Sequence, residues 1–269
     1  MTTYALDNAW RKARERLSGL ETVFDPGTIR HLADRGVGAG WRCLEIGGGG
    51  GSIAARLSER VGPTGRVLAT DIDTRFLEPL VADHPNLEVR RHDIAVEDLP
   101  EGAFDLVHAR MVLEHLPGRD AALGRMAGAL AAGGWLVVES IDFRTEAPDL
   151  AVSAAYAGLA AKLHDARNGL LASRGFDLRF ARGLDRRLRS HGLGDVATEG
   201  RASSWRGGSP GTGLECLSVE QLRDAYIAGG FLIERDIANI LAMLDDPDFA
   251  TVSPMVLAAW GRKGKQEDG

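Results

Sequence analysis

Residues 43–52 read CLEIGGGGGS, and this stretch decides the fold. The apolar residues of 41–46 predict a short buried strand, five glycines follow it, and the apolar spacing of 52–60 predicts a helix. A strand, a glycine loop and a helix form the opening unit of a doubly wound α/β domain. Because glycine has no Cβ, a ligand can approach the main chain there, next to the unpaired N–H groups that begin the helix. The stretch therefore predicts a site for a small ligand that carries an anionic group.

Two ligand classes use such a loop. The dinucleotide pattern G-x-G-x-x-G/A is imperfect here, because counting from Gly47 brings Ser52 to the third small position. The pattern acid-x-G-x-G-x-G is complete in Glu45, Gly47, Gly49 and Gly51. On these residues the sequence resembles the class I S-adenosylmethionine-dependent methyltransferases, and the resemblance implies that the four residues hold S-adenosylmethionine. A nicotinamide dinucleotide site and a merely flexible glycine run remain the alternatives at this point.

The composition sets broad limits on the class of protein. The chain has 269 residues, of which 44% are hydrophobic and 26% charged, as expected for a globular protein with one substantial core. A net charge of −6 argues against a broad nucleic-acid-binding surface. Cys43 and Cys216 give neither a disulfide framework nor zinc spacing. No apolar run is long enough to span a membrane and the first residues lack a signal-peptide pattern, so we expect a cytoplasmic protein without a membrane partner. We also expect a monomer or a homodimer.

Two acidic residues follow the next predicted strands. Asp71 ends the strand of residues 66–70, where a carboxylate can accept hydrogen bonds from both ribose hydroxyls of a nucleoside lying across the sheet. A helix cap is the other interpretation, although Asp73 fits that role better. Asp93 follows the strand of residues 87–91, and the resemblance implies that it receives the adenine amino group, with Ile72 and Ile94 flanking the ring. Turn formation is the alternative for Asp93.

The segment after the fourth predicted strand adds the next specific motif. Residues 104–110 read FDLVHAR and residues 111–117 read MVLEHLP, followed by a helix, a glycine stop and an apolar fifth strand at 135–140. This order resembles the same family, and the resemblance extends over about residues 41–143. It places Arg110, at the end of the fourth strand, in the cofactor site.

Two residues at the carboxyl ends of these strands are candidates for catalysis. His115 follows the fourth strand and Asp142 follows the fifth, and in a parallel sheet both ends lie on the side of the glycine loop. A histidine can accept a hydroxyl proton near neutrality while a carboxylate orients it, and some natural-product O-methyltransferases that this chain resembles use a pair so placed. Alternatively, His115 caps the next helix and Asp142 only ends a strand. His108 and His164 are the second candidates for the base.

The remaining segments complete the predicted architecture. Residues 1–40 form two N-terminal helices, the second starting at Pro26 with Asp25 as its cap. Residues 41–143 form the cofactor-binding core, 144–192 a helical cap insertion rich in arginine, 193–262 the completion of the sheet and 263–269 a disordered tail. The expected fold is α/β, a seven-strand Rossmann-like doubly wound sheet with an antiparallel last strand.

The expected reaction is methyl transfer from S-adenosylmethionine to a hydroxyl or amine of a small molecule, such as a secondary metabolite. No metal-ligand spacing is visible, so we expect a metal-independent enzyme. A nicotinamide-dependent oxidoreductase is the first alternative, and Ser52, the terminal strand and the lack of a Tyr-x-x-x-Lys pair count against it. The second alternative is a protein that binds S-adenosylmethionine without methylating anything, and the sequence leaves it open.

Overall fold

The structure is a computed structural model that describes residues 6–265, and it divides into two compact units. The sheet unit contains residues 24–140, 179–200 and 257–265, and the helical unit contains residues 6–23, 141–178 and 201–256. This division differs from the predicted boundaries, since residues 6–40 and the predicted cap 144–192 are each shared between units. Residues 201–256, expected to complete the sheet, belong to the helical unit. An amphipathic pattern shows that a helix face is buried, but it does not show against which element.

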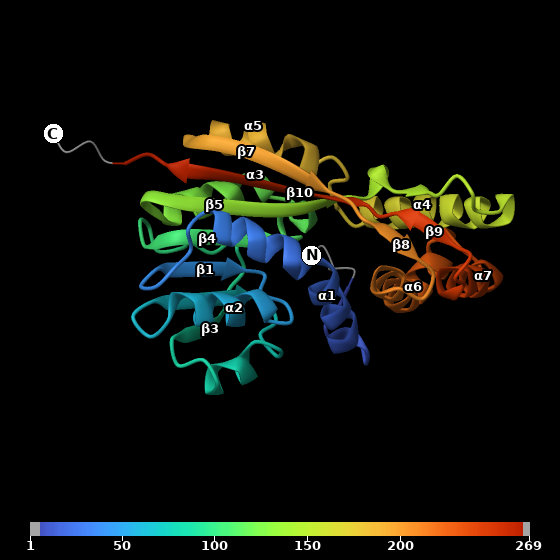
Figure 1. The fold of residues 1–269 in the computed structure, drawn as a ribbon, viewed down its shortest axis with the longest axis horizontal. Coiled ribbons are helices and arrows are strands. Elements are labelled where there is room, and N and C mark those ends of the chain that lie inside the picture. The colour runs from blue at the N-terminus through green and yellow to red at the C-terminus, as the bar shows by residue number, and fades with distance from the viewer. Residues whose placement is uncertain (1–5, 266–269) are drawn as a thin grey trace. The chain divides into compact units, whose positions relative to one another are not determined.

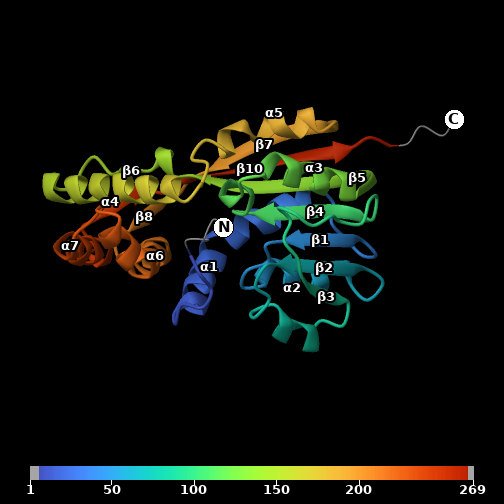
Figure 2. The ribbon, with the colours of Figure 1, turned by 180° about the vertical axis from the view of Figure 1, so that it is seen from behind.

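The sheet has seven strands in the order β3-β2-β1-β4-β5-β10-β7 (Figure 1). Seen from behind in Figure 2, β2 lies between β1 and β3. The pairs from β3 to β5 are parallel and the last strands are antiparallel, so the predicted Rossmann-like sheet is confirmed. The strands are β1 (Arg42–Ile46), β2 (Arg66–Asp71), β3 (Leu87–Arg91), β4 (Phe104–Arg110), β5 (Leu130–Asp142), β7 (Leu193–Arg201) and β10 (Met255–Lys263).

Helices cover both faces of this sheet, because successive strand residues point to opposite sides. Leu44 and Val107 pack in one cluster with Leu123 of α3 (Arg119–Ala129), and α5 (Leu184–Ser190) adds apolar residues to the same cluster. Cys43 and Leu106 pack in a second cluster with residues of α2 (Ser52–Val61). Short 3-10 turns lie between these elements at η1 (Glu78–Ala82), η2 (Leu113–His115) and η4 (Ala181–Gly183).

Helix α1 (Ala13–Asp34) is a single helix, where the sequence predicted two. It continues through Pro26, and Asp25 makes an ion pair with Arg110 in place of the predicted cap. From Phe24 onward α1 belongs to the sheet unit, and Leu32 packs in the same apolar cluster as α2. At the other end of the chain β10 reaches Lys263, inside the predicted tail, whose residues 266–269 lie outside the described part.

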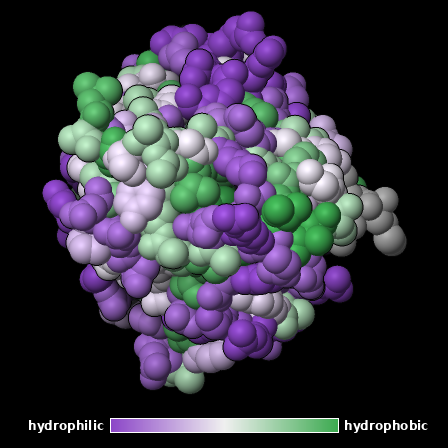
Figure 3. Space-filling view, turned by 90° about the vertical axis from the view of Figure 1, so that its right-hand side faces the viewer, coloured by the Kyte–Doolittle hydropathy of each residue, from purple (hydrophilic) through white to green (hydrophobic). Residues whose placement is uncertain are grey.

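The helical unit is built on three helices and a small antiparallel sheet. Its apolar core includes Leu163, Leu222 and Ile240, one from each helix, together with Phe249. On the face drawn in Figure 3, apolar residues form small separate groups between hydrophilic ones. The elements are η3 (Phe143–Thr145), β6 (Ala147–Pro148), α4 (Ala154–Ser173), β8 (Ser204–Arg206), α6 (Pro210–Ala228), α7 (Glu234–Asp245) and β9 (Ala250–Val252).

A glycine in this unit gives a first prediction, on stability. A Cβ at Gly207 would lie 1.8 Å from the main-chain oxygen of Asp246, so Gly207→Ala must push two backbone segments apart. We expect a loss of about 3 kcal/mol in unfolding free energy, the usual size of an overpacking effect. The control is Gly213→Ala inside α6, where nothing lies within 4 Å of the new Cβ. There alanine should stabilise by about 0.5–1 kcal/mol. Equal urea midpoints for the two variants would contradict the packing described.

Candidate functional site

The glycine loop between β1 and α2 has the backbone form that its sequence requires. Gly47, Gly49 and Gly51 have φ values of +67°, +54° and +92°, a region that favours glycine. At two of them the protein itself also needs the space. A Cβ at Gly47 would lie 2.3 Å from Cγ2 of Val112, and one at Gly51 would lie 2.2 Å from Cδ1 of Leu80. Packing and conformation therefore both demand glycine at Gly47 and Gly51, and at Gly49 the positive φ favours it.

Asp71, at the end of β2, contacts the glycine loop directly. Its carboxylate accepts hydrogen bonds from the N–H of Gly49 and the N–H of Asp73, each at 3.0 Å. Burial raises the pKa of Asp71, and the N–H donors partly offset this effect. The next side chain, Ile72, is 52% exposed although it is large and apolar. The sequence-predicted acid and glycine loop are thus together, beside an apolar side chain that faces solvent.

The predicted adenine contacts after β3 are less uniform. The carboxylate of Asp93 accepts a hydrogen bond from the N–H of Ala95 at 2.9 Å, which is the turn-forming role that the sequence left open. Ile94 is only 4% exposed and belongs to the cluster on the α3 face of the sheet. Of the two isoleucines predicted to flank the ring, Ile72 is therefore the one that faces solvent in this structure.

The predicted catalytic residues lie in different units. His115 is half-buried and ends the short turn η2 in the sheet unit. Asp142 lies in the helical unit, is fully buried, and accepts a hydrogen bond from the N–H of Arg144 at 3.1 Å. Asp142 therefore caps the start of the 3-10 turn η3 that follows β5, and its pairing with His115 stays a prediction.

The two second candidates for the base differ in access to a substrate. His108 is completely buried, so it cannot meet an acceptor molecule in this structure. His164 is half-buried on α4, and its Nε2 lies 2.9 Å from Nδ2 of Asn168. Of these two, only His164 retains solvent contact.

A buried charged network lies on the α1 and α2 face of the sheet. The strand register sets Glu45 of β1 beside His108 of β4, and Glu45 Oε2 lies 2.6 Å from His108 Nδ1. On the other side of the ring, Nε2 lies 3.7 Å from Oε2 of Glu139 on β5. Glu139 also accepts a hydrogen bond from the hydroxyl of Thr28 on α1. All four residues are at most 3% exposed.

Arg110 extends this network to the surface of α1. Its Nη1 donates to the hydroxyl of Thr28 at 2.9 Å, and its Nη2 lies 2.8 Å from Oδ1 of Asp25. The side chain is 8% exposed, so both groups of α1 hold it in a largely buried position. The predicted role of Arg110 in cofactor binding stays a prediction, and its guanidinium is here engaged by α1.

The charges of the network shift the pKa values of its members. Burial alone would lower the pKa of His108, but Glu45 and Glu139 outweigh it and raise the pKa to about 9. Burial would raise the pKa of Glu139, but the nearby charge of His108 lowers it. We therefore assign a protonated imidazole between two carboxylates at neutral pH.

This assignment gives a second prediction, on pH dependence. The folded-state pKa of His108 exceeds its ordinary value of 6.5, so its contribution to stability is complete below pH 6.5 and is lost as the pH rises through 9. The contribution is on the order of 3 kcal/mol. Unfolding free energies of the wild type should fall between these pH values, and those of His108→Gln should fall much less. Parallel pH profiles of the two proteins would refute the charged imidazole.

Sequence reasoning missed Glu139, Thr28 and Asp25 as members of this network. A signal was present, because His108 and Glu139 are polar residues inside strands that are otherwise mainly apolar. Such interruptions indicate a buried pair. Identifying the partners needs the strand order and the packing of α1.

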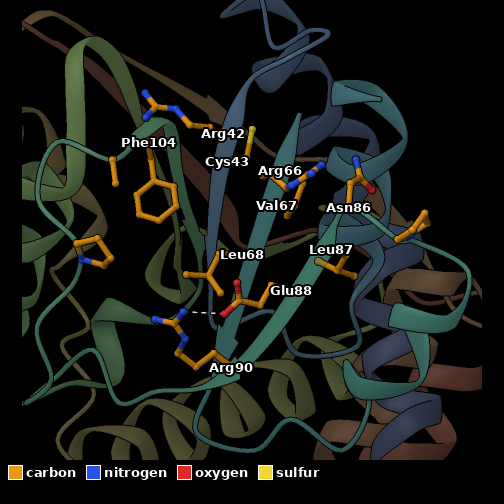
Figure 4. Close-up of a pocket in the computed structure, with 13 residues that line it drawn as sticks. Arg42, Cys43, Arg66, Val67, Leu68, Asn86, Leu87, Glu88, Arg90 and Phe104 are labelled. Atoms are coloured by element: carbon orange, nitrogen blue, oxygen red, sulfur yellow. Dashed lines mark hydrogen bonds and ion pairs between the residues drawn. The ribbon is translucent and has the colours of Figure 1, made fainter. Parts of the chain in front are cut away.

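A hollow of about 420 Å³ lies elsewhere on the sheet unit (Figure 4). Arg42, Arg66 and Leu87 mark the amino ends of three of its strands, opposite the carboxyl ends that carry the glycine loop. Glu88 and Arg90 form an ion pair at its rim. This hollow is separate from the candidate cofactor site.

The described residues contain neither a candidate metal site nor a helix that could span a membrane. Across residues 6–265, no group of three or more His, Cys, Asp or Glu side chains is arranged to hold a metal ion. Over the same range, every helix is too short or too polar to cross a membrane.

Comparisons with known proteins agree with the geometry. A family model described as a methyltransferase domain matches residues 44–136. The methyltransferase str3 of Strobilurus tenacellus is 34% identical over 148 residues, which is 53% of this chain and 50% of that protein. The chain spans about half the length of the curated relatives it matches.

Solved structures share the fold at low sequence identity. One is a phosphoethanolamine N-methyltransferase 2 of Haemonchus contortus, solved with phosphomonomethylethanolamine and S-adenosylhomocysteine; its TM-score is 0.52 at 15% identity, over 85% of this chain and 50% of that one. Another is the [4+2]-cyclase SpnF, with a TM-score of 0.55 at 15% identity, over 88% of this chain and 79% of that one. At such identities these likenesses establish the fold alone.

Proposed function

We propose that this chain, which carries a class I S-adenosylmethionine-dependent methyltransferase domain, transfers a methyl group from S-adenosylmethionine to a hydroxyl or amine of a small molecule. The observation that carries the proposal is the contact between Asp71 and the N–H of Gly49. It joins the acid at the end of β2 to the loop that opens α2, which are the two groups expected to hold the ribose and the amino-acid part of the cofactor.

The residues proposed for the cofactor follow from this arrangement. Gly49 contributes a loop conformation that favours glycine, Asp71 offers its carboxylate to the ribose hydroxyls, and Ile72 offers an exposed apolar surface to the adenine ring. Asp93 is proposed for the adenine amino group. Glu45 is buried behind the loop and acts through the loop backbone.

The chemistry assigned to the chain is limited to positioning and proton removal. S-adenosylmethionine supplies an electrophilic methyl group, so the protein must hold the acceptor in line with it and exclude water. For a hydroxyl acceptor, His115 would take the proton. A neutral amine acceptor would need no base before attack. No metal takes part in the proposed reaction.

The decisive experiment measures S-adenosylhomocysteine formation with a library of small hydroxyl and amine compounds. Thermal shifts with S-adenosylhomocysteine and with NAD accompany it, because the nicotinamide alternative predicts stabilisation by NAD alone. The second candidate is the one that the sequence leaves open, a protein that binds the cofactor without consuming it. Binding of S-adenosylhomocysteine together with no turnover on any acceptor class would favour that candidate over methyl transfer.

A further inference from the structure

The buried network beneath the glycine loop has a role that the proposed function does not use. We propose that His108 is a positioning residue, which holds Glu45 behind the glycine loop and joins it through Glu139 to helix α1. Ligand affinity at the glycine loop then depends on the position of α1, through the buried hydroxyl of Thr28. This inference rests on the proposed function for its binding measurement only.

The first step is the contact between His108 and Glu45. Glu45 precedes Gly47 by two residues on β1, so the position of its side chain is tied to the start of the loop. The 2.6 Å contact with His108 Nδ1 fixes one carboxylate oxygen. The ring itself is fully buried between carboxylates on neighbouring strands, with Nδ1 2.6 Å from Glu45 and Nε2 3.7 Å from Glu139.

The second step runs from Glu139 to α1. The hydroxyl of Thr28 donates to Glu139 Oε2 and accepts from Nη1 of Arg110, so it lies between a carboxylate and a guanidinium. Arg110 in turn pairs with Asp25, one turn earlier on α1. A displacement of α1 would break these bonds together.

The other groups that face the network leave its charge unchanged. His31 of α1 lies 4.0 Å from Glu139 Oε1, and burial lowers the pKa of His31, so its ring is neutral. The ring of His31 also packs on Trp260 of β10, with centroids 5.4 Å apart. The imidazolium of His108 is thus the one cation between the two buried carboxylates among these contacts.

The cost of the arrangement supports a positioning role over simple packing. Two carboxylates and an imidazole inside an apolar layer must be desolvated, and apolar side chains of similar volume would stabilise such a layer as well or better. What a charged network adds is a unique geometry. A loop held in its binding form before the ligand arrives loses less entropy on binding.

The test uses a mild change at the α1 end of the network. Thr28→Val removes the hydroxyl and keeps the shape, and it should weaken S-adenosylhomocysteine binding by about 3- to 10-fold in calorimetry, the worth of roughly one hydrogen bond. Thr28→Ser restores the hydroxyl and should return the affinity to within about twofold. The matched control is Thr22→Val on the same helix, where the hydroxyl bonds only to the main chain of Ser18. Affinity should be unchanged there.

The ring itself is tested in the ligand-free wild type by nitrogen-15 NMR of histidine. The imidazole of His108 should keep both protons at about pH 8, where an ordinary histidine is neutral. A neutral ring there, or wild-type affinity in Thr28→Val, overturns the inference and leaves the proposed function intact. If the wild type does not bind S-adenosylhomocysteine at all, the proposed function is contradicted. The proposed role of the glycine loop in binding is then contradicted as well.

Discussion

Asp71→Ala should weaken the binding of S-adenosylhomocysteine by about 10- to 150-fold, which corresponds to about 1.5–3 kcal/mol for hydrogen bonds to a charged group. The carboxylate lies at the carboxyl end of β2, where a ribose would lie across the sheet. It also accepts a hydrogen bond from Gly49, so its loss removes a ligand contact and loosens the loop at once. Isothermal calorimetry of the folded variant gives the dissociation constant.

Two further variants separate these effects. Asp71→Asn keeps an oxygen that can accept from Gly49 but loses the charge, so its affinity should fall between those of the wild type and the alanine variant. Asp73→Ala, two residues along, removes a carboxylate that pairs with Arg75 at the surface and should leave the affinity unchanged. If Asp73→Ala matters as much as Asp71→Ala, the ribose does not lie on Asp71.

The parts of the fold that the sequence predicts are those set by local pattern. The apolar run before Gly47, the glycines and the amphipathic residues after Ser52 specify a strand, a turn and a helix within a short stretch, and the structure has all three. Repetition of apolar strands along the chain predicts a parallel sheet, and such a sheet brings the carboxyl ends of its strands to one edge. The same logic placed Asp71 beside the loop.

The parts that failed depend on contacts between distant segments. The local sequence does not predict that α1 continues through Pro26. Asp25 suits a helix cap by residue type, but in the structure it pairs with Arg110. Ser218 followed by Gln221 is likewise a residue pattern typical of a helix start, but Ser218 lies inside α6 and its hydroxyl donates to the main chain of Leu214. In both cases tertiary contacts override a local sequence pattern that favours a helix start.

The same limit applies to the candidate site. His108 was a possible base by residue type, and its burial between Glu45 and Glu139 removes it from contact with any acceptor. The sequence identifies a histidine in a strand as a possible acid or base. Only the strand register and the covering helix show whether its side chain faces a ligand or the core. His115, outside the strand and half-buried, keeps the access that His108 lacks.

His115→Ala should lower kcat by roughly 10²- to 10⁴-fold on a hydroxyl acceptor, the usual contribution of a general base. Its affinity for S-adenosylhomocysteine should stay at the wild-type value, because the residue is proposed to act on the acceptor. The control is His191→Ala, a half-buried histidine that pairs with the exposed Asp120 and takes no part in the proposal. Its kcat should stay within about twofold of the wild type.

The expected effect of His115→Ala on kcat depends on the class of acceptor. With an amine that attacks as the neutral base, the proton leaves after methyl transfer, so His115→Ala should cost little there while remaining severe on a hydroxyl. A loss below about tenfold on hydroxyl acceptors would leave positioning and exclusion of water as the source of rate. In that outcome His164→Ala is the next comparison, because His164 also retains solvent contact. A large effect at His164 and none at His115 would move the base from the sheet unit to the helical unit.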